Sequence, residues 1–413
     1  MQIKSLNLLL LFTLLSFVAR GQSVIQESLF TDDYTINPEN AGVLGLSIDN
    51  ISFLKNNESD GDVVKGYTAP GFRLNPRLVF YPSPIIKLEA GLSLLRYWGA
   101  DKYPNYAYSD IAEWKADHYQ WGFHLLPFFR AQIQPIPQLN IILGNLYGGD
   151  NHGLIDPMYH RDLNFTADPE LGAQVLYNSR VAHVDAWVNW ESFTFNNETH
   201  NEAVTVGGAV DFHITDPKSF FYLGVPVQAM FIHRGGELDT IVGDILSMAN
   251  GAAGLRFGFN FDNPYFKSVG LDVMGLGFKA FAYKEESLFF SEGWAFYSRL
   301  YAQIWHLNVK MGFWRSGNYM NLFGTPIFGN VSNVHDWLTF PRTMVYNPGI
   351  RYEQKFGNGF YLGADFECFY SPDLTAYSQN VRPVQTKNSF NCSMGVYLRI
   401  NPSIVFKKYV LPK

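Results

Sequence analysis

The densest group of chemically reactive side chains in the sequence lies in the segment GGDNHGLIDPMYHRDLNF, residues 148–165. This segment combines imidazoles, carboxylates and a guanidinium, at His152, Asp156, His160, Arg161 and Asp162. Histidines and carboxylates together can bind a metal ion or form an acid–base pair. Although three of them have the i, i+4, i+8 spacing of one helix face, Gly153 and Pro157 interrupt a regular helix. We therefore expect an ordered loop that bonds to its surroundings, with no metal and no other cofactor.

The elements that must position this loop are marked by alternation. The stretch HVDAWVNWES, residues 183–192, has polar residues at odd positions and apolar residues at even positions until Ser192. A period of two is typical of a strand whose two faces meet different environments. A soluble sandwich would bury the apolar face against a second sheet. A membrane barrel would instead expose that face to lipid and turn the polar face toward its lumen.

The N-terminal residues point to export. An apolar run, LNLLLLFTLLSFVA, is followed by RGQS, with small residues at Ala19 and Gly21. This pattern predicts a secretory signal peptide over residues 1–21, followed by a single barrel domain over residues 22–413. No later segment has the roughly 18 consecutive apolar residues that a membrane helix needs, so a helical membrane protein is excluded.

Composition favours the barrel over a soluble sandwich. Aromatic and charged residues each make up 16% of the chain, and soluble domains usually have a charged fraction of roughly 25%. Strands that alternate between a lipid-facing and a lumen-facing residue produce this balance. The net charge of −6 is weak, which argues against a nucleic-acid partner.

Strand candidates follow one another along the chain, about sixteen in all. They lie near residues 43–54, 72–81, 86–98, 118–130, 139–147, 171–178, 181–194, 203–214, 219–232, 252–262, 267–283, 294–304, 306–315, 344–356, 360–370 and 388–399. Short, turn-like links alternate with long connections near 55–71, 99–117, 148–170, 195–202, 233–251, 284–293, 316–343 and 371–387. We therefore predict an all-β fold, a closed antiparallel transmembrane β-barrel with short periplasmic turns and long extracellular loops.

With its leader ending in GQS, its alternating aromatic-rich segments and its eight long connections, the chain resembles the porin-like outer-membrane barrels of Gram-negative bacteria, of the Bacteroidota type. Many of these proteins have no assigned function. The resemblance implies a location in the outer membrane, contact with its lipid, and a channel through which small polar solutes diffuse. It leaves a homo-oligomer open. It rests on pattern and carries no site residues over to this chain.

Residues on the predicted inner wall carry charges of both signs, so strong ion selectivity is not implied. These pore-lining candidates are Arg73, Arg77, Lys87, Glu89, Asp185, Glu191, Asp211, Arg256, Arg299, Lys310, Arg351, Glu353, Lys355, Asp365 and Glu367. Segment 148–165 is expected to fold inward and narrow the lumen. Loop 316–343 is a second candidate constriction, and loop 233–251, with a short helix over 238–248, is a third.

The alternative to a channel is a barrel scaffold with an enzymatic or envelope-assembly role, with its chemistry in segment 148–165. The sequence shows no G-x-S-x-G elbow and no paired-carboxylate signature above background. We therefore expect that the chain is not an enzyme. Its two cysteines, Cys368 and Cys392, would lie opposite each other if their strands pair as a hairpin. A disulfide and a pair of free apolar thiols both remain open.

Overall fold

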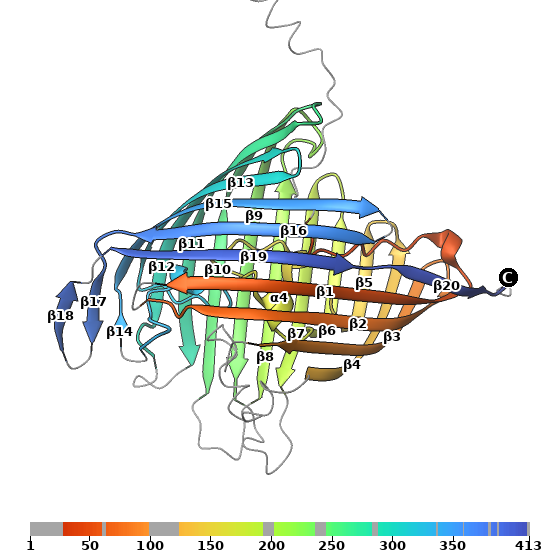
Figure 1. The fold of residues 1–413 in the computed structure, drawn as a ribbon, viewed down its shortest axis with the longest axis horizontal. Helices are drawn as coiled ribbons and strands as arrows, with labels where there is room; N and C mark the ends of the chain where they lie inside the picture. The colour runs from red at the N-terminus through yellow and green to blue at the C-terminus, as the bar shows by residue number, and fades with distance from the viewer. Residues whose placement is uncertain are drawn as a thin grey trace, which may run out of the picture.

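The computed structural model describes residues 28–59, 63–98, 124–192, 202–235, 245–282, 288–335, 338–357, 359–378, 381–385 and 388–410. Sixteen strands form a closed antiparallel barrel (Figure 1). The first eight are β1 (Val43–Ser59), β2 (Tyr67–Ser83), β3 (Ile86–Tyr97), β4 (His124–Ile136), β5 (Leu139–Asn145), β6 (Leu171–Asn178), β7 (Ala182–Ser192) and β8 (Ala203–His213). The remaining eight are β9 (Phe221–Arg234), β10 (Leu246–Asn260), β11 (Phe266–Ala282), β12 (Glu292–Ile304), β13 (Leu307–Gly317), β15 (Arg342–Gly357), β16 (Phe360–Ser371) and β19 (Ser389–Ile400).

Each strand pairs with its neighbour in the chain, and β19 pairs with β1 to close the wall. Closure removes the free edges whose backbone groups would be unsatisfied in lipid. A short strand after β19, β20 (Ser403–Lys408), continues along the first part of β1. Outside the wall, β14 (Leu338–Thr339), β17 (Thr375–Ser378) and β18 (Val381–Gln385) form a small sheet at the end with the long loops (Figure 1).

The two faces of the wall differ as the alternation predicts. On β11, the side chains of Leu271 and Phe281 are exposed on the outside, whereas Asp272 between them in sequence is buried inside. Exposed leucines, valines and phenylalanines recur on the outer face of most other strands. In a barrel this exposed apolar band contacts lipid. No helix in the described part of the chain is long and apolar enough to cross a membrane.

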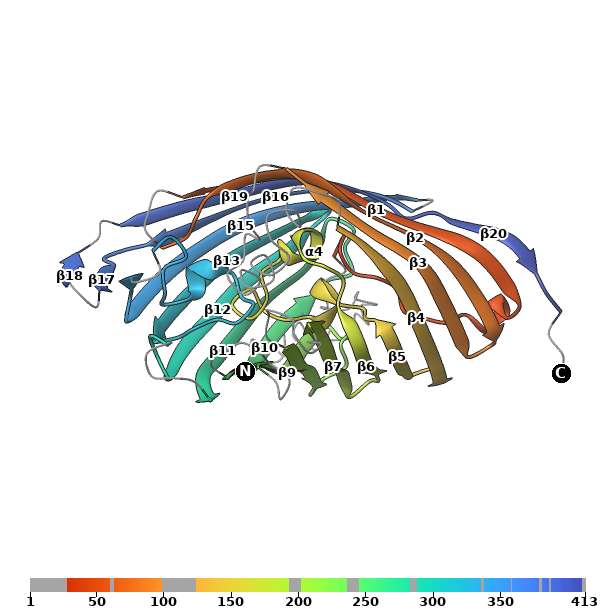
Figure 2. The ribbon, with the colours of Figure 1, turned by 90° about the horizontal axis from the view of Figure 1, so that it is seen from below.

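Three segments of the chain fill the lumen (Figure 2). The first is the N-terminal segment 28–42, which contains the 3-10 helix η1 (Pro38–Asn40). The second is the β5–β6 connection 146–170, with η3 (Gly149–His152) and the single-turn helix α4 (Leu163–Thr166). The third is the connection 318–341 between β13 and β15, with η4 (Pro326–Phe328).

The filling segments pack against the wall with apolar side chains. Phe323 and Phe328 from connection 318–341 lie in one buried cluster with Met274 and Trp314 of the wall. Phe165 of α4 is fully buried in a second cluster that also contains Phe30, Phe53 and Tyr397. Each fully buried side chain of this size contributes about 1.5–3 kcal/mol. The interior is therefore a packed core at this level of the barrel.

The predicted strands agree with the structure, but several limits differ. The segment 55–71 is shorter as a loop than predicted, because β1 continues to Ser59 and β2 begins at Tyr67. The end of the helix predicted over 238–248 is wrong, because β10 begins at Leu246; residues 236–244 lie outside the described part of the chain. The signal peptide and residues 118–123 of the fourth predicted strand also lie outside it.

Candidate functional site

The charged residues predicted on the inner wall lie on inward faces, where most of them pair with one another or with the filling segments. Arg256 bonds to Asp211 and Asp272, and Arg299 bonds to Asp272 at 2.8 Å. Glu89 lies 3.3 Å from Lys87 and 3.6 Å from Arg77. The others on inward faces are Arg73, Asp185, Glu191, Lys310, Arg351, Glu353, Lys355, Asp365 and Glu367. That these side chains line a solute path stays a prediction.

Connection 146–170 is fixed in the lumen by ion pairs to the wall. Arg161 Nη2 lies 2.8 Å from Glu353 Oε1, and its Nη1 lies 3.8 Å from Asp365. Asp156 accepts a hydrogen bond from Lys310 Nζ at 2.7 Å. Through Arg161 and Asp156 the segment thus contacts three of the predicted wall residues, and one of these, Lys310, lies 2.9 Å from a fourth, Glu367.

His152 serves a structural role in this connection. Its Nδ1 lies 2.7 Å from Asp185 and its Nε2 lies 2.8 Å from Glu170. Burial opposes a charge on this imidazole, but the two carboxylates outweigh burial and raise its pKa to about 10. A histidine that stays protonated in this way anchors the loop and cannot accept a proton near neutral pH.

His160 has the opposite character. Its side chain is 12% exposed, its Nε2 lies 3.6 Å from Asp162 Oδ2, and its Nδ1 has no hydrogen-bond partner. Burial lowers the pKa of His160, and the neighbouring Asp162 carboxylate offsets only part of this effect. A neutral imidazole with a free ring nitrogen is the form that accepts a proton.

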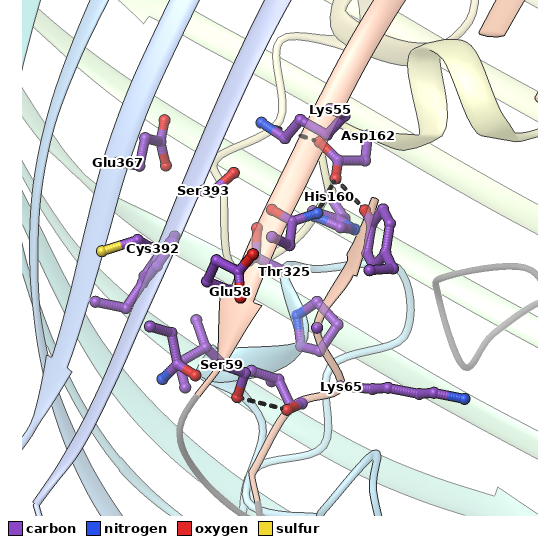
Figure 3. A pocket seen from close by; sticks show the side chains of 18 of the residues that line it. Lys55, Glu58, Ser59, Lys65, His160, Asp162, Thr325, Glu367, Cys392 and Ser393 are labelled. Atoms are coloured by element: carbon purple, nitrogen blue, oxygen red, sulfur yellow. Dashed lines mark hydrogen bonds and ion pairs between the residues drawn. The ribbon is translucent and has the colours of Figure 1, made fainter. Parts of the chain in front are cut away.

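Asp162 links this histidine to two residues of the wall (Figure 3). Tyr67 donates a hydrogen bond from its hydroxyl to Asp162 Oδ2, and Lys55 Nζ lies 3.5 Å from Asp162 Oδ1. Burial disfavours the charge of Asp162, but Lys55, His160 and the bond from Tyr67 hold its pKa below the ordinary value. Lys55 also bonds to Asp365 at 2.9 Å. The result is a buried ion network with His160 at its edge.

These residues line a cavity of about 80 Å³ between β1, β16, β19 and the two filling connections (Figure 3). That volume holds several water molecules or an ester group. Glu58 and Lys65, both exposed, lie at the long-loop end of the cavity, which Thr325 also lines. The cavity therefore opens toward the extracellular rim, because long loops mark that side of an outer-membrane barrel.

Two parts of this site were missed by sequence reasoning. Lys55 and Tyr67 fell in a segment predicted as loop, although the alternation of inward Lys55, Asn57 and Ser59 continues the pattern of β1. The N-terminal segment was also missed: Ser28 Oγ bonds to Asp150 at 2.9 Å, and Asp32 bonds to Arg399. Segment 28–36 has no periodic pattern that would have marked it as a plug. No group of three or more metal-ligating side chains occurs in the described part of the chain.

The fold and the lipid-facing wall define the chain as an outer-membrane β-barrel protein. The family model for the lipid A 3'-O-deacylase type matches residues 36–409, so the chain belongs to that family. A comparison with curated proteins finds no match. The prediction that the chain is not an enzyme is therefore contradicted, because its family is described as an enzyme family.

Solved structures with similar folds are outer-membrane proteins. A loop-deletion mutant of OmpT from Vibrio cholerae is 9% identical, with 86% of this chain and 99% of that chain covered and a TM-score of 0.48. The anion-selective porin from Comamonas acidovorans is also 9% identical, with 86% and 100% covered and a TM-score of 0.46. OccAB4 of Acinetobacter baumannii is 11% identical, with 89% and 100% covered and a TM-score of 0.45.

Proposed function

We propose that this protein is an outer-membrane hydrolase that removes an ester-linked acyl chain from a lipid A-type glycolipid, with His160 as its general base. The observation that carries the proposal is the state of His160: a largely buried, neutral imidazole beside a carboxylate, whose Nδ1 has no hydrogen-bond partner, on a residue that lines a cavity open to the extracellular rim. The family description supplies the substrate class. This proposal develops the scaffold alternative to the channel.

Ester hydrolysis needs a base, an oriented water and positive charge near the developing oxyanion. In the proposed reaction, His160 Nδ1 takes a proton from a water molecule whose oxygen attacks the ester carbonyl carbon. Lys55, separated from His160 by the Asp162 carboxylate, supplies the nearby positive charge. The tetrahedral intermediate then collapses, the bond to the alkoxy oxygen breaks, and His160 returns its proton to the leaving alcohol. The products are a fatty acid and a free hydroxyl on the glycolipid.

The separation of His160 and Asp162 fits this role. At 3.6 Å the contact is longer than a hydrogen bond. Catalytic contacts are often long in the free enzyme and tighten when substrate excludes water. Asp162 is held by Tyr67 and Lys55, so its carboxylate can orient the imidazole with Nε2 toward itself, which leaves Nδ1 without a partner.

Diffusion of small polar solutes, the first expectation from sequence, receives no support from the interior of this barrel. The described residues of connections 146–170 and 318–341 pack against the wall and bury polar and apolar side chains alike. An aqueous channel needs an unobstructed polar lumen. The filled interior instead suits a scaffold that fixes reactive groups at one rim.

His160→Asn tests the proposal. The change keeps a polar side chain but removes the base, so we expect release of fatty acid from purified lipid A to fall at least 100-fold, as loss of a general base does. His213→Gln at the short-turn rim is the control and should keep wild-type activity. Both variants are first checked for the heat-modifiable gel migration of a folded barrel. A folded His160→Asn protein that releases fatty acid at the wild-type rate overturns the proposal.

A further inference from the structure

A second cavity, of about 290 Å³, lies in the other half of the lumen. Residues of β1, β2 and β20 near the short-turn rim line it, among them Val43, Tyr81 and Val405. It therefore faces the periplasm. The N-terminal segment at Asp32 lies on one side of it, and Tyr147 of connection 146–170 lies on another. The proposed hydrolytic site does not include this space.

The cavity is rich in buried cations. Arg77, Lys87 and Arg130 all lie within 3.6 Å of the one carboxylate of Glu89. Each of the three nitrogens of Arg130 makes a hydrogen bond, because it also donates to the backbone carbonyls of Asn145 and Leu146. Arg77 and Lys87 keep donor capacity that Glu89 alone does not satisfy.

The charges around this cavity do not balance among the described residues. The four cations that line it are Arg77, Lys87, Arg130 and Arg399, and the carboxylates that pair with them are those of Asp32, Asp49 and Glu89. One positive charge is left in excess. Asp33 at the mouth is exposed and water screens its charge, while Asp168 and Glu170 in the adjoining space pair with His124 and His152.

One of these cations has an unpartnered polar atom. Arg77 Nε is buried without a hydrogen-bond partner, and the residue is 6% exposed. Arg73 Nε, four positions earlier on the same face of β2, is also unpartnered, and Arg73 lines the adjoining cavity. A buried guanidinium N–H without an acceptor is costly, and an uncompensated buried charge costs more. An oxyanion would satisfy both requirements, since arginine binds phosphate and carboxylate with parallel hydrogen bonds.

We propose that the periplasmic cavity binds a small soluble oxyanion, a phosphate- or carboxylate-bearing molecule, through Arg77 and Lys87. The ligand enters from the periplasm and shares these two cations with Glu89. Because it occupies the half of the lumen opposite His160, its binding is independent of the hydrolytic reaction. The N-terminal segment, held by Arg399 through Asp32 and the carbonyls of Leu29 and Thr31, forms one side of this site.

The test measures the unfolding temperature of the detergent-solubilised barrel in rising inorganic phosphate or succinate, against sodium chloride of equal ionic strength. The wild type should show a saturable increase with at least one of the two anions. Arg77→Gln should weaken the apparent affinity at least tenfold. Arg180→Gln removes an exposed cation at the same rim and should change the apparent affinity for the anion less than twofold.

If Arg77→Gln does not fold, Lys87→Gln serves in its place, and it should also weaken binding at least tenfold. His160→Asn should bind the anion as the wild type does, which separates this site from the hydrolytic one. Phosphate-selective and succinate-selective responses both support the proposal and identify the oxyanion. No saturable increase with either anion in the wild type overturns it, as does equal binding by the wild type and the folded Arg77→Gln or Lys87→Gln variant.

Discussion

The imidazole of His152 lies flat on the indole of Trp187, with ring centroids 3.6 Å apart and an angle of 13° between the planes. Asp185 and Glu170 bind its two ring nitrogens at 2.7 and 2.8 Å. The charged ring is thus held by two carboxylates and by the face of an aromatic side chain, which attracts a cation. This arrangement joins connection 146–170 to β7.

His152 should make the stability of the barrel depend on pH. Its pKa of about 10 in the folded protein lies above the value of about 6.5 in an unfolded chain. The stabilisation is therefore complete below about pH 6.5 and disappears as pH rises through about 10, with a size on the order of a few kcal/mol. Urea unfolding in detergent between pH 6 and pH 10.5 measures it.

His152→Gln is the matching variant for this pH series. The His152→Gln protein should be less stable than the wild type at pH 6. Its unfolding free energy should fall much less between pH 6.5 and 10 than that of the wild type, whereas the His213→Gln protein should show the full wild-type decrease. An unchanged pH profile in the His152→Gln protein would show that another group sets the dependence.

The second prediction concerns the depth at which residues of the lipid-facing wall lie in the bilayer. Val188→Arg on the outer face of β7 should destabilise the barrel by about 2–4 kcal/mol if it lies near the bilayer midplane, because the charge must be buried in lipid. Val181 precedes β7 at the short-turn rim and is 66% exposed. Val181→Arg should cost about 0–1 kcal/mol. Equal losses in unfolding free energy would contradict the assigned depth of β7.

Much of the wall could be predicted from sequence because its two solvents differ so strongly. Lipid on one side and a polar or packed interior on the other impose a period of two that survives along β7 and β11. The short turns fixed the register further, since Pro, Gly, Asn and Asp leave few turn geometries. Alternation and turn residues therefore located the sixteen strands of the wall, whose ends differ, whereas β14, β17, β18 and β20 were not predicted.

The interior was harder to predict because its contacts join residues far apart in the chain. Arg161 meets Glu353 and Asp365, and Lys55 meets Asp162, across separations that no local pattern encodes. Segment 148–165 was identified as chemically important from its composition. The opposite protonation of His152 and His160 depends on which carboxylates the fold brings to each ring, and sequence spacing carries no information about that.

Removing the filling loop should convert the barrel into a channel. Deletion of residues 151–164 takes away Arg161, Asp156 and Leu163 of α4, but leaves the backbone pairing of β5 with β6 intact. We expect a folded barrel whose single-channel conductance in a planar bilayer is well above that of the wild type. A folded deletion variant that conducts no better would place the main obstruction in connection 318–341.

Cys368 and Cys392 are register partners on β16 and β19, with sulfur atoms 3.4 Å apart and no disulfide between them. The sequence-based pairing of the two strands is therefore confirmed, and bond formation requires only a small approach of the sulfurs. Mild oxidation with a copper–phenanthroline catalyst should produce an intramolecular disulfide, seen in intact-mass spectra as the loss of two hydrogens. Cys392→Ser should show no such loss. An unchanged wild-type mass after oxidation would contradict the prediction.

The carboxylate beside the proposed base should control the pH dependence of hydrolysis. Asp162 raises the pKa of His160 against the larger effect of burial, so its removal should lower that pKa further. In Asp162→Asn the acid limb of kcat/KM should therefore move to lower pH than in the wild type. The rate on the plateau should also fall, because the imidazole loses the group that orients it.

Asp216→Asn, at an exposed position on the short-turn rim, is the control and should leave both the limb and the plateau unchanged. Tyr67→Phe provides an intermediate case, since it removes one bond to Asp162 but keeps the carboxylate. The acid limb of its kcat/KM profile should move to lower pH by less than the acid limb of the Asp162→Asn protein. If the acid limb of the folded Asp162→Asn protein coincides with that of the wild type, the titrating base is not His160, because no neighbouring change in charge of this size would leave its pKa in place.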